Sequence, residues 1–198
     1  MAPEPFGILL AAGLGARYDP TGRALKLLAP ARRGPHVGVP MAAAAARTLR
    51  AAVSNVVAVV RPPDSPAQRQ LHTILRRERC ALAVCIDANA GMSASIACGI
   101  QATQSAAGWI LALADMPAIE VSTVSAVIRL LRDGALTAAP TLRGQRGHPV
   151  GFAAKLRPEL LALSGDTGAR AVLLAHPPRL IAVDDPGVLY DVDTIEEN

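Results

Sequence analysis

A glycine-containing stretch with basic residues on its carboxyl side is the clearest candidate for chemistry in this 198-residue chain. Gly13 and Gly15 follow the apolar run Phe6–Ala11, and Arg17 and Lys26 come after them. Such glycines let backbone N–H groups approach a ligand, and the two cations supply the charge that a polyphosphate needs. The stretch contains neither Gly-Lys-Ser/Thr nor a complete Gly-x-Gly-x-x-Gly. It predicts a phosphate-binding loop of another kind, with a plain strand-to-helix turn as the alternative.

A carboxylate stands at the end of a later apolar run. Asp115 directly follows Trp109–Ala114, and a carboxylate there suits a hard cation such as Mg²⁺, which takes oxygen ligands. Asp191 and Asp193 alternate along an extended segment, so both can face the same side. Either is a candidate second metal ligand. Helix capping is the alternative role for Asp115 and for Asp193.

Small polar residues mark a third candidate loop. Gly91, Ser93 and Ser95 follow the apolar run Ala81–Ile86 and open a helical pattern. Their N–H groups and hydroxyls are candidates to hold a ligand, and an ordinary serine N-cap is the alternative.

The elements that must position these residues alternate between strand and helix patterns. Apolar or β-branched runs predict strands, and segments of helical periodicity with capping residues predict helices. Strands are expected at Phe6–Ala11, Asn55–Val60, Ala81–Ile86, Trp109–Ala114, Leu136–Pro140, Val150–Ala153 and Leu180–Val183. Helices are expected at Pro40–Val53, Asp64–Arg79, Ser93–Ser105, Val121–Asp133, from Pro158 onward and at Ala169–His176, with a turn or helix at Asp191–Glu197.

This order predicts an α/β fold with a doubly wound, mostly parallel sheet, because helical segments of ten or more residues allow parallel crossovers. We expect one domain spanning residues 1–198, since no linker divides the chain. The turn Arg143–Gly147 lies between two strands and predicts a small hairpin in the C-terminal third. Ligands bind at the carboxyl ends of the strands in such sheets, which is where the three candidate loops fall.

Composition narrows the classes of partner. The net charge is +4, but aromatic residues make up only 3%, which leaves few stacking platforms for single-stranded nucleic acid. A small phosphorylated ligand explains the charge equally well, and no nucleic-acid partner is expected. No apolar stretch approaches the ~20 residues that span a bilayer, and the N-terminus lacks the basic region of a signal peptide. We expect a cytoplasmic protein without a membrane partner.

Six motifs occur in an order that resembles the MobA-like NTP transferase family. Within that family they look most like molybdenum cofactor cytidylyltransferases of the MocA type. The motifs are Leu10–Gly13 with Arg17 and Lys26, Gly91–Ser95, Leu113–Pro117, Gly147–Pro149, Gly165–Arg170 and Asp191–Thr194.

The resemblance implies a Rossmann-like nucleotidyltransferase fold and a reaction. A cytidylyl group would pass from CTP to the terminal phosphate of molybdopterin carrying molybdenum, with Mg²⁺ as cofactor and pyrophosphate as the second product. The product, molybdopterin cytosine dinucleotide, would serve a molybdenum hydroxylase of the xanthine dehydrogenase class.

The resemblance also implies a role for each matching residue. Leu10, Ala11, Ala12, Gly13 and Gly15 would cradle the nucleotide, Arg17 and Lys26 would act on its phosphates, and Gly91, Ser93 and Ser95 would contact its base or ribose. Asp115 and Asp193 would hold Mg²⁺, and His148 and Arg170 would line the molybdopterin side. Ala12 stands where guanylyl-transferring relatives usually carry a second glycine, and its methyl group would favour a smaller pyrimidine.

Other readings remain open beside this one. The segment between Arg17 and Lys26 is longer than the family usually has, so Arg23 is an alternative to Lys26 as the phosphate contact. A related transferase would use another nucleotide or another phosphorylated acceptor. The non-enzymatic alternatives are a molybdopterin carrier and a basic module that binds nucleic acid.

Overall fold

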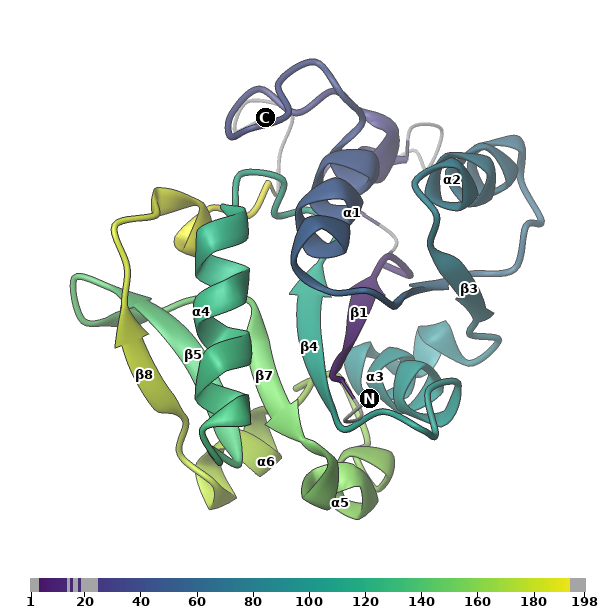
Figure 1. Cartoon of the computed structure of the whole chain (residues 1–198). Helices are drawn as coiled ribbons and strands as arrows, with labels where there is room; N and C mark the ends of the chain where they lie inside the picture. The colour runs from purple at the N-terminus through teal and green to yellow at the C-terminus, as the bar shows by residue number, and fades with distance from the viewer. Residues whose placement is uncertain (1–3, 14, 16–17, 19–24, 193–198) are drawn as a thin grey trace.

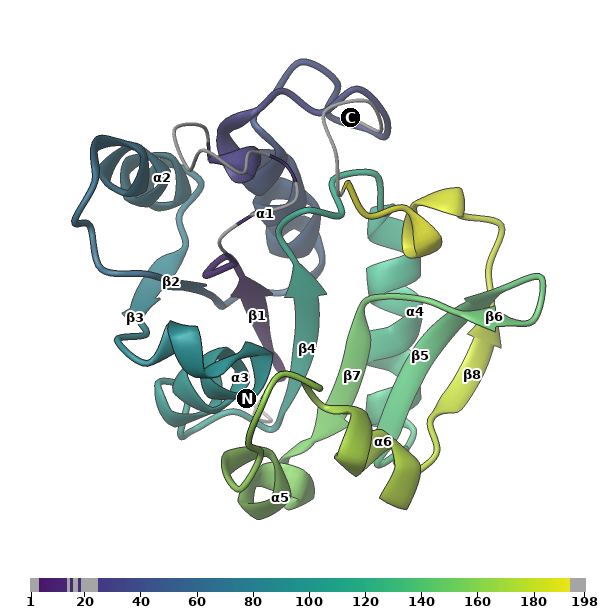
Figure 2. The same cartoon turned by 180° about the vertical axis from the view of Figure 1, so that it is seen from behind.

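The computed structural model describes residues 4–13, 15, 18 and 25–192, which form one sheet with helices on both faces (Figures 1 and 2). The strand order is β3-β2-β1-β4-β7-β5-β6, and β8 pairs with β5. The strands are β1 (Phe6–Leu10), β2 (Val56–Val60), β3 (Ala81–Val84), β4 (Gly108–Leu113), β5 (Thr137–Leu142), β6 (Gln145–Arg146), β7 (Val150–Ala153) and β8 (Arg179–Ala182).

The sheet has a parallel half and a mixed half. β1 pairs in parallel with β2 and β4, and β2 pairs in parallel with β3. The register of β1 places Leu10 beside Val59 of β2 and Leu113 of β4, so the three strands end at nearly the same level. β7 then lies antiparallel between β4 and β5, and β8 runs parallel to β5. The carboxyl ends of β1–β4 therefore share one edge.

Helices cover both faces of the sheet. The helices are α1 (Met41–Ala52), α2 (Pro66–Arg77), α3 (Met92–Gln101), α4 (Val121–Arg132), α5 (Arg157–Leu161) and α6 (Arg170–Ala175). Short 3-10 turns lie at η1 (Lys26–Leu28), η2 (Ala88–Ala90), η3 (Ala154–Leu156) and η4 (Pro186–Leu189). Figure 1 shows α1 and α4 in front of the sheet, and Figure 2 shows α3, α5 and α6 in front of the other face.

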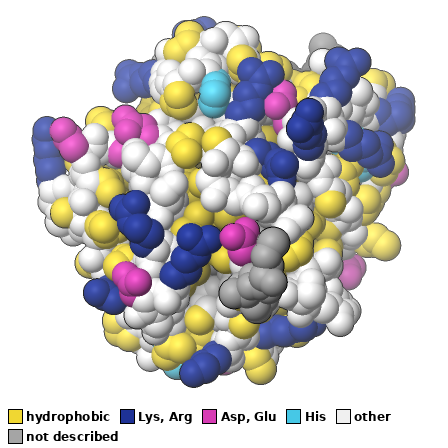
Figure 3. Space-filling model, viewed as in Figure 1, with side chains coloured by type: hydrophobic (Ala, Val, Ile, Leu, Met, Phe, Trp, Pro, Cys, Tyr) yellow, Lys and Arg dark blue, Asp and Glu magenta, His cyan; other side chains and the backbone are white. Residues whose placement is uncertain are grey.

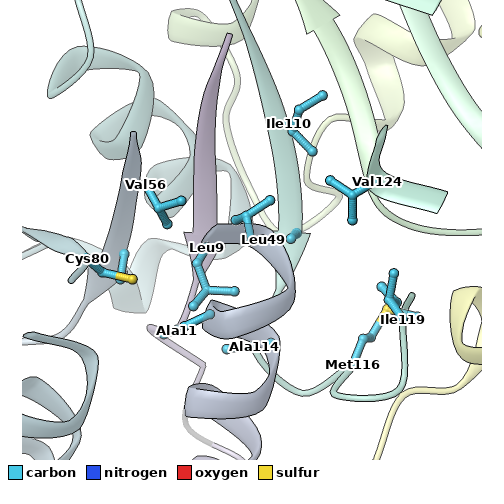
Figure 4. Packing of buried hydrophobic residues seen from close by; sticks show 14 of the residues in the cluster. Leu9, Ala11, Leu49, Val56, Cys80, Ile110, Ala114, Met116, Ile119 and Val124 are labelled. Carbon is cyan, nitrogen blue, oxygen red and sulfur yellow. The ribbon is translucent and has the colours of Figure 1, made fainter. Parts of the chain in front are cut away.

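Alternating side chains of the central strands build two cores. Leu9 and Ile110 pack under α1 and α4, and Figure 4 shows this cluster, in which Leu49 and Val124 come from those helices. Ile8 belongs with Trp109 and Leu111 to the cluster under α3 and α5. Because successive residues of a strand point to opposite faces, a strand buried on both faces needs a continuous apolar run. This is the reason that the central strands read as unbroken apolar segments.

The structure confirms the predicted α/β fold and mostly parallel sheet. The two strands predicted to flank the hairpin turn, β5 and β7, do pair antiparallel. The predicted turn itself contains a strand that was not expected, because Gln145–Arg146 forms β6, which pairs antiparallel with β5 across Arg143 and Gly144, two residues with positive φ. Strand β7 lies inside the sheet, between β4 and β5, and not at an edge.

Several element ends differ from the prediction. The helix expected from Asp64 begins at Pro66, because the Ser65 hydroxyl accepts a hydrogen bond from the N–H of Gln68 and caps it. The helix expected at Ser93–Ser105 runs from Met92 to Gln101. The strand expected to reach Ile86 ends at Val84, and Ile86 is 81% exposed.

Most of the C-terminal turn or helix expected from Asp191 lies outside the described residues.

In the part of the chain that the structure describes, no helix has both the length and the apolar character to cross a bilayer. Basic side chains occur at many separate points of the face seen in Figure 3.

Candidate active site

A cavity of about 610 Å³ opens at the carboxyl ends of β1–β4. The strands run parallel there, so the loops that leave them converge on one place. The lining consists of Leu10, Ala12, Gly13, Gly15, Lys26, Arg61, Ala88, Asn89, Ala90, Gly91, Met92, Ser95, Leu113, Asp115 and Asp166. We call it the first cavity. It brings together residues of all three loops that the sequence singles out.

An ion pair lies in this cavity. The Lys26 ammonium donates a hydrogen bond to Oδ2 of Asp115 at 2.7 Å. The Lys26 side chain is only 9% exposed and that of Asp115 26% exposed, so water screens the pair less than a surface pair. Lys26 opens η1, and Asp115 follows β4, 89 residues further along the chain. The pairing joins the predicted phosphate contact to the predicted metal ligand.

The start of α3 is fastened to a loop from the C-terminal third. Gly91 has a φ of 109°, and a Cβ there would lie 2.6 Å from the carbonyl oxygen of Gly165. The Met92 N–H donates to Oδ1 of Asp166 at 3.1 Å. The buried Ser93 hydroxyl contacts two further carbonyl oxygens of the same loop, those of Ser164 and Gly168, at 3.2 and 3.3 Å. Ser93 therefore joins two loops of the site.

A second cavity of about 550 Å³ adjoins the first. Leu10, Met92 and Leu113 line both cavities, so the two share a wall. The second cavity has an apolar body with basic and polar groups at its margin. Its remaining lining residues are Ile96, Leu111, Arg146, His148, Val150, Phe152, Thr167, Gly168, Ala169, Arg170, Leu173 and Leu174. An arrangement of two adjoining cavities suits a reaction between two substrates.

His148 lies in the second cavity as a neutral side chain. Burial, aided by the positive charge of Arg146, lowers its pKa to about 4, while Asp115 acts in the opposite direction. Its backbone N–H donates to the carbonyl oxygen of Val188 at 3.0 Å. The buried Nδ1 atom has no hydrogen-bond partner among the described residues. Above about pH 5 the ring offers hydrogen bonds without a charge.

The structure describes one of the two residues predicted to bind a metal ion. Asp115 has one carboxylate oxygen on Lys26 and faces the first cavity, which fits Mg²⁺ because that ion keeps several waters and uses one or two carboxylates. Asp193 lies outside the described residues, while Asp191 is exposed. The N–H of Val192 donates to the carbonyl oxygen of Asp115 at 3.1 Å, so the C-terminal segment reaches this site. Within the described ranges, no three His, Cys, Asp or Glu side chains gather as a metal cluster.

The predicted residues are distributed over three places. Leu10, Ala12, Gly13, Gly15, Lys26, Gly91, Ser95 and Asp115 line the first cavity, and His148 and Arg170 line the second. Ala11 is buried in the core under α1, and Ser93 is buried between the two loops. Arg17 lies outside the described residues.

Arg61 and Asn89 also line the first cavity, although neither was predicted from the sequence as a site residue. Arg61 directly follows the apolar run of β2, which is the signal that identified Asp115 after β4. That signal was available for Arg61. Asp166 lies in the Gly165–Arg170 motif, which by the family resemblance would line the molybdopterin side, but it lines the first cavity and accepts a hydrogen bond from the N–H of Met92.

Comparison with known proteins agrees with this geometry. Residues 7–180 match the model of the MobA-like NTP transferase domain. Nicotine blue oxidoreductase of Paenarthrobacter nicotinovorans is 32% identical over 206 residues, which cover 98% of this chain and 95% of the relative. Purine catabolism protein PucB of Bacillus subtilis (strain 168) is 28% identical, with coverage of 99% and 95%.

Solved structures share the fold. Crystalline Rv0371c of Mycobacterium tuberculosis H37Rv superposes with a TM-score of 0.82 at 24% identity, covering 100% of this chain and 96% of the other. Its complex with manganese superposes with a TM-score of 0.75 at 23% identity, covering 98% and 95%. The match of the family model over most of the chain, together with the two-cavity site, shows that the protein belongs to the MobA-like NTP transferase family and is a nucleotidyltransferase.

Proposed function

We propose that this nucleotidyltransferase is a molybdenum cofactor cytidylyltransferase of the MocA type, formed by one domain over residues 1–198 and working in the cytoplasm. It transfers the cytidylyl group of CTP to the terminal phosphate of molybdenum-bearing molybdopterin. The products are molybdopterin cytosine dinucleotide and pyrophosphate. A molybdenum hydroxylase then receives the dinucleotide.

The observation that carries the proposal is the Lys26–Asp115 pair beside the wall between the two cavities. The first cavity combines a glycine loop with this pair, which suits a nucleoside triphosphate. The second combines an apolar body with Arg146 and Arg170, which suits a flat heterocycle that carries an anionic group. Substrates bound in two cavities that share a wall would have their reacting phosphates close to each other.

The chemistry needs no protein nucleophile. An oxygen of the acceptor phosphate attacks the α-phosphorus of CTP, forming the new P–O bond while the bond to the β-phosphate oxygen breaks and pyrophosphate leaves. Catalysis consists of positioning and charge neutralisation. Lys26, with Arg17, stabilises charge on the leaving group, and the glycine loop Leu10–Gly15 holds the nucleotide. His148 binds the acceptor rather than removing a proton, because an acceptor phosphate is already anionic.

A divalent cation belongs to this proposal. Asp115 and Asp193 would hold Mg²⁺, and the manganese complex of Rv0371c supports a divalent ion at this fold. When bound, the ion supplies positive charge that lets two polyanions approach each other.

Two further features support CTP and the molybdenum cofactor. Ala12, which lines the first cavity, stands where guanylyl-transferring relatives usually carry a glycine, and the added methyl group would favour a pyrimidine over a larger purine. The name of the Bacillus relative places that protein in purine catabolism, and molybdenum hydroxylases of the xanthine dehydrogenase class oxidise purines.

Pyrophosphate release tests the proposal. CTP, GTP, ATP and UTP are compared with Mg²⁺, each with and without molybdenum-loaded molybdopterin. Release from CTP that requires the acceptor is the expected result. Release from another nucleotide would mean that the protein uses the same mechanism with a different nucleotide substrate. Pterin binding without any release would favour the carrier.

A further inference from the structure

Arg61 connects two loops of the first cavity. Its Nε–H donates to the carbonyl oxygen of Ala12 at 2.6 Å, and its Nη1 donates to Oδ1 of Asn89 at 2.8 Å. Its own carbonyl oxygen lies 2.8 Å from Nε2 of the buried His72 in α2. Both ends of Arg61 are therefore held, and its guanidinium plane is fixed between the loop after β1 and the η2 turn.

This contact determines which end of the Asn89 amide is available to a ligand. Oδ1 accepts the hydrogen bond from Arg61, and Asn89 lines the first cavity. The amide NH₂ makes no hydrogen bond to any residue that the structure describes. An asparagine held by its oxygen presents two N–H donors and no free acceptor of equal strength. The side chain is thus set to recognise an acceptor atom.

The position of Asn89 in the sheet assigns that acceptor to the far end of a bound nucleotide. Asn89 follows β3, whereas Asp115 follows β4, and β2 and β1 lie between these strands. At ~4.8 Å per strand the two ends of the cavity are about 14 Å apart. Lys26 and Asp115 lie at the β4 end, and the residues flanking Asn89 in η2 are alanines. If the phosphates bind beside Lys26 and Asp115, the base lies at the η2 end, where the Nε and Nη1 atoms of Arg61 already donate to Ala12 and Asn89.

We propose that Asn89 recognises a carbonyl oxygen of the nucleobase through its amide NH₂, and that Arg61 is the positioning residue that holds this amide in one orientation. The inference rests on the proposed function, since it assigns the base end of the same cavity. Cytosine, uracil and guanine carry a carbonyl oxygen, and adenine does not. Asn89 therefore selects against ATP, while the size restriction at Ala12 selects against GTP.

Calorimetric titration of the full-length protein with CTP and with ATP, both in the presence of Mg²⁺, tests this assignment. Asn89→Ala removes the donors and should lower the preference for CTP over ATP by about threefold to tenfold. Asn89→Asp replaces the donors with acceptors that repel the carbonyl oxygen, so the preference should fall further. Arg61→Gln should shift the preference in the same direction as Asn89→Ala. Thermal unfolding checks that each variant is folded.

Asn55→Asp is the matched control. Asn55 is exposed and precedes β2, at the opposite end of the strand from Arg61, so it carries the same charge change away from the cavity. The control should keep the wild-type preference. If folded Asn89→Ala keeps the wild-type preference for CTP over ATP, the assignment of Asn89 to the base is wrong, while the proposed function still stands. If Arg61→Gln loses equal affinity for both nucleotides, Arg61 contacts the phosphates and does not position Asn89. A wild-type protein that binds neither nucleotide would refute the proposed function itself.

Discussion

Gly91→Ala tests whether the contact between α3 and the 164–168 loop holds the site together. Gly91 has φ 109° and ψ −178°, a backbone conformation that is essentially restricted to glycine. An added Cβ would lie 2.6 Å from the carbonyl oxygen of Gly165 and 2.9 Å from Cα of Asp166. Both atoms belong to the backbone, so no side-chain rotation relieves the collision. The loop and the helix must move apart.

The expected loss of stability has two parts. The backbone conformation costs an alanine about 1–3 kcal/mol. Separation of the loop from the helix weakens two hydrogen bonds, the one from the Met92 N–H to Asp166 and the one that the single Ser93 hydroxyl hydrogen shares between the carbonyl oxygens of Ser164 and Gly168. Each is worth about 0.5–1.5 kcal/mol. If one or both of these bonds are lost, the free energy of unfolding falls by about 1.5–6 kcal/mol.

Gly134→Ala separates backbone strain from collision. Gly134 has a φ of 88° after α4, and a Cβ added there would have no other atom within 4 Å. The free energy of unfolding of Gly134→Ala should fall by only about 1–2 kcal/mol, which is the cost of an alanine in the left-handed conformation. Urea unfolding followed by the single, buried Trp109 measures both variants, and calorimetry measures their nucleotide affinity. Gly91→Ala should lose more stability and also nucleotide affinity. Equal losses in the two variants would refute the reasoning.

Three further predictions concern single side chains. Asp115→Asn should lower Mg²⁺-dependent pyrophosphate release by roughly 100-fold, while Asp133→Asn at the exposed end of α4 should not; retained turnover would remove Asp115 from the metal site. Because the pKa of His148 in the folded state, about 4, lies below the ordinary value of 6.5, its contribution to stability is complete above pH 6.5 and falls as the pH drops toward 4. Urea unfolding at pH 7 and pH 5 should show a smaller acid loss in His148→Gln, and an unchanged loss would contradict the assignment. Thr103→Val leaves the buried Trp109 Nε1–H without its acceptor at 2.8 Å and should cost about 1–3 kcal/mol of unfolding free energy, which urea unfolding measures by circular dichroism; no change would show that water replaces the hydroxyl.

The sequence predicted the parallel half of the sheet well. β1 and β4 are buried on both faces, so their residues form continuous apolar runs that local inspection can recognise. It also placed Asp115 at the carboxyl end of β4, since the edge at which parallel strands end follows from their direction alone. Element ends were less predictable, as Ser65 and Val84 show, because capping bonds and the length of strand pairing set them.

Other parts of the site followed from the family resemblance rather than from local pattern. The assignment of His148 to the acceptor side came from a short turn motif, and its cavity position became visible only in the fold. Arg61 followed an apolar run as clearly as Asp115 did, yet its role depends on its bonds to Ala12 and Asn89. No periodicity in one segment records contacts between three loops.

By itself, the sequence determined the alternation of strands and helices, the apolar faces and the edge of the sheet that carries the functional loops. These properties depend on neighbours two to four residues away, which the chain states directly. Only the tertiary structure decided that β7 lies beside β4, that Lys26 pairs with Asp115, and that the 164–168 loop fastens the start of α3. Those contacts join residues 74 and 89 positions apart, so they depend on how helices pack on both faces of the sheet, and no local pattern encodes that packing.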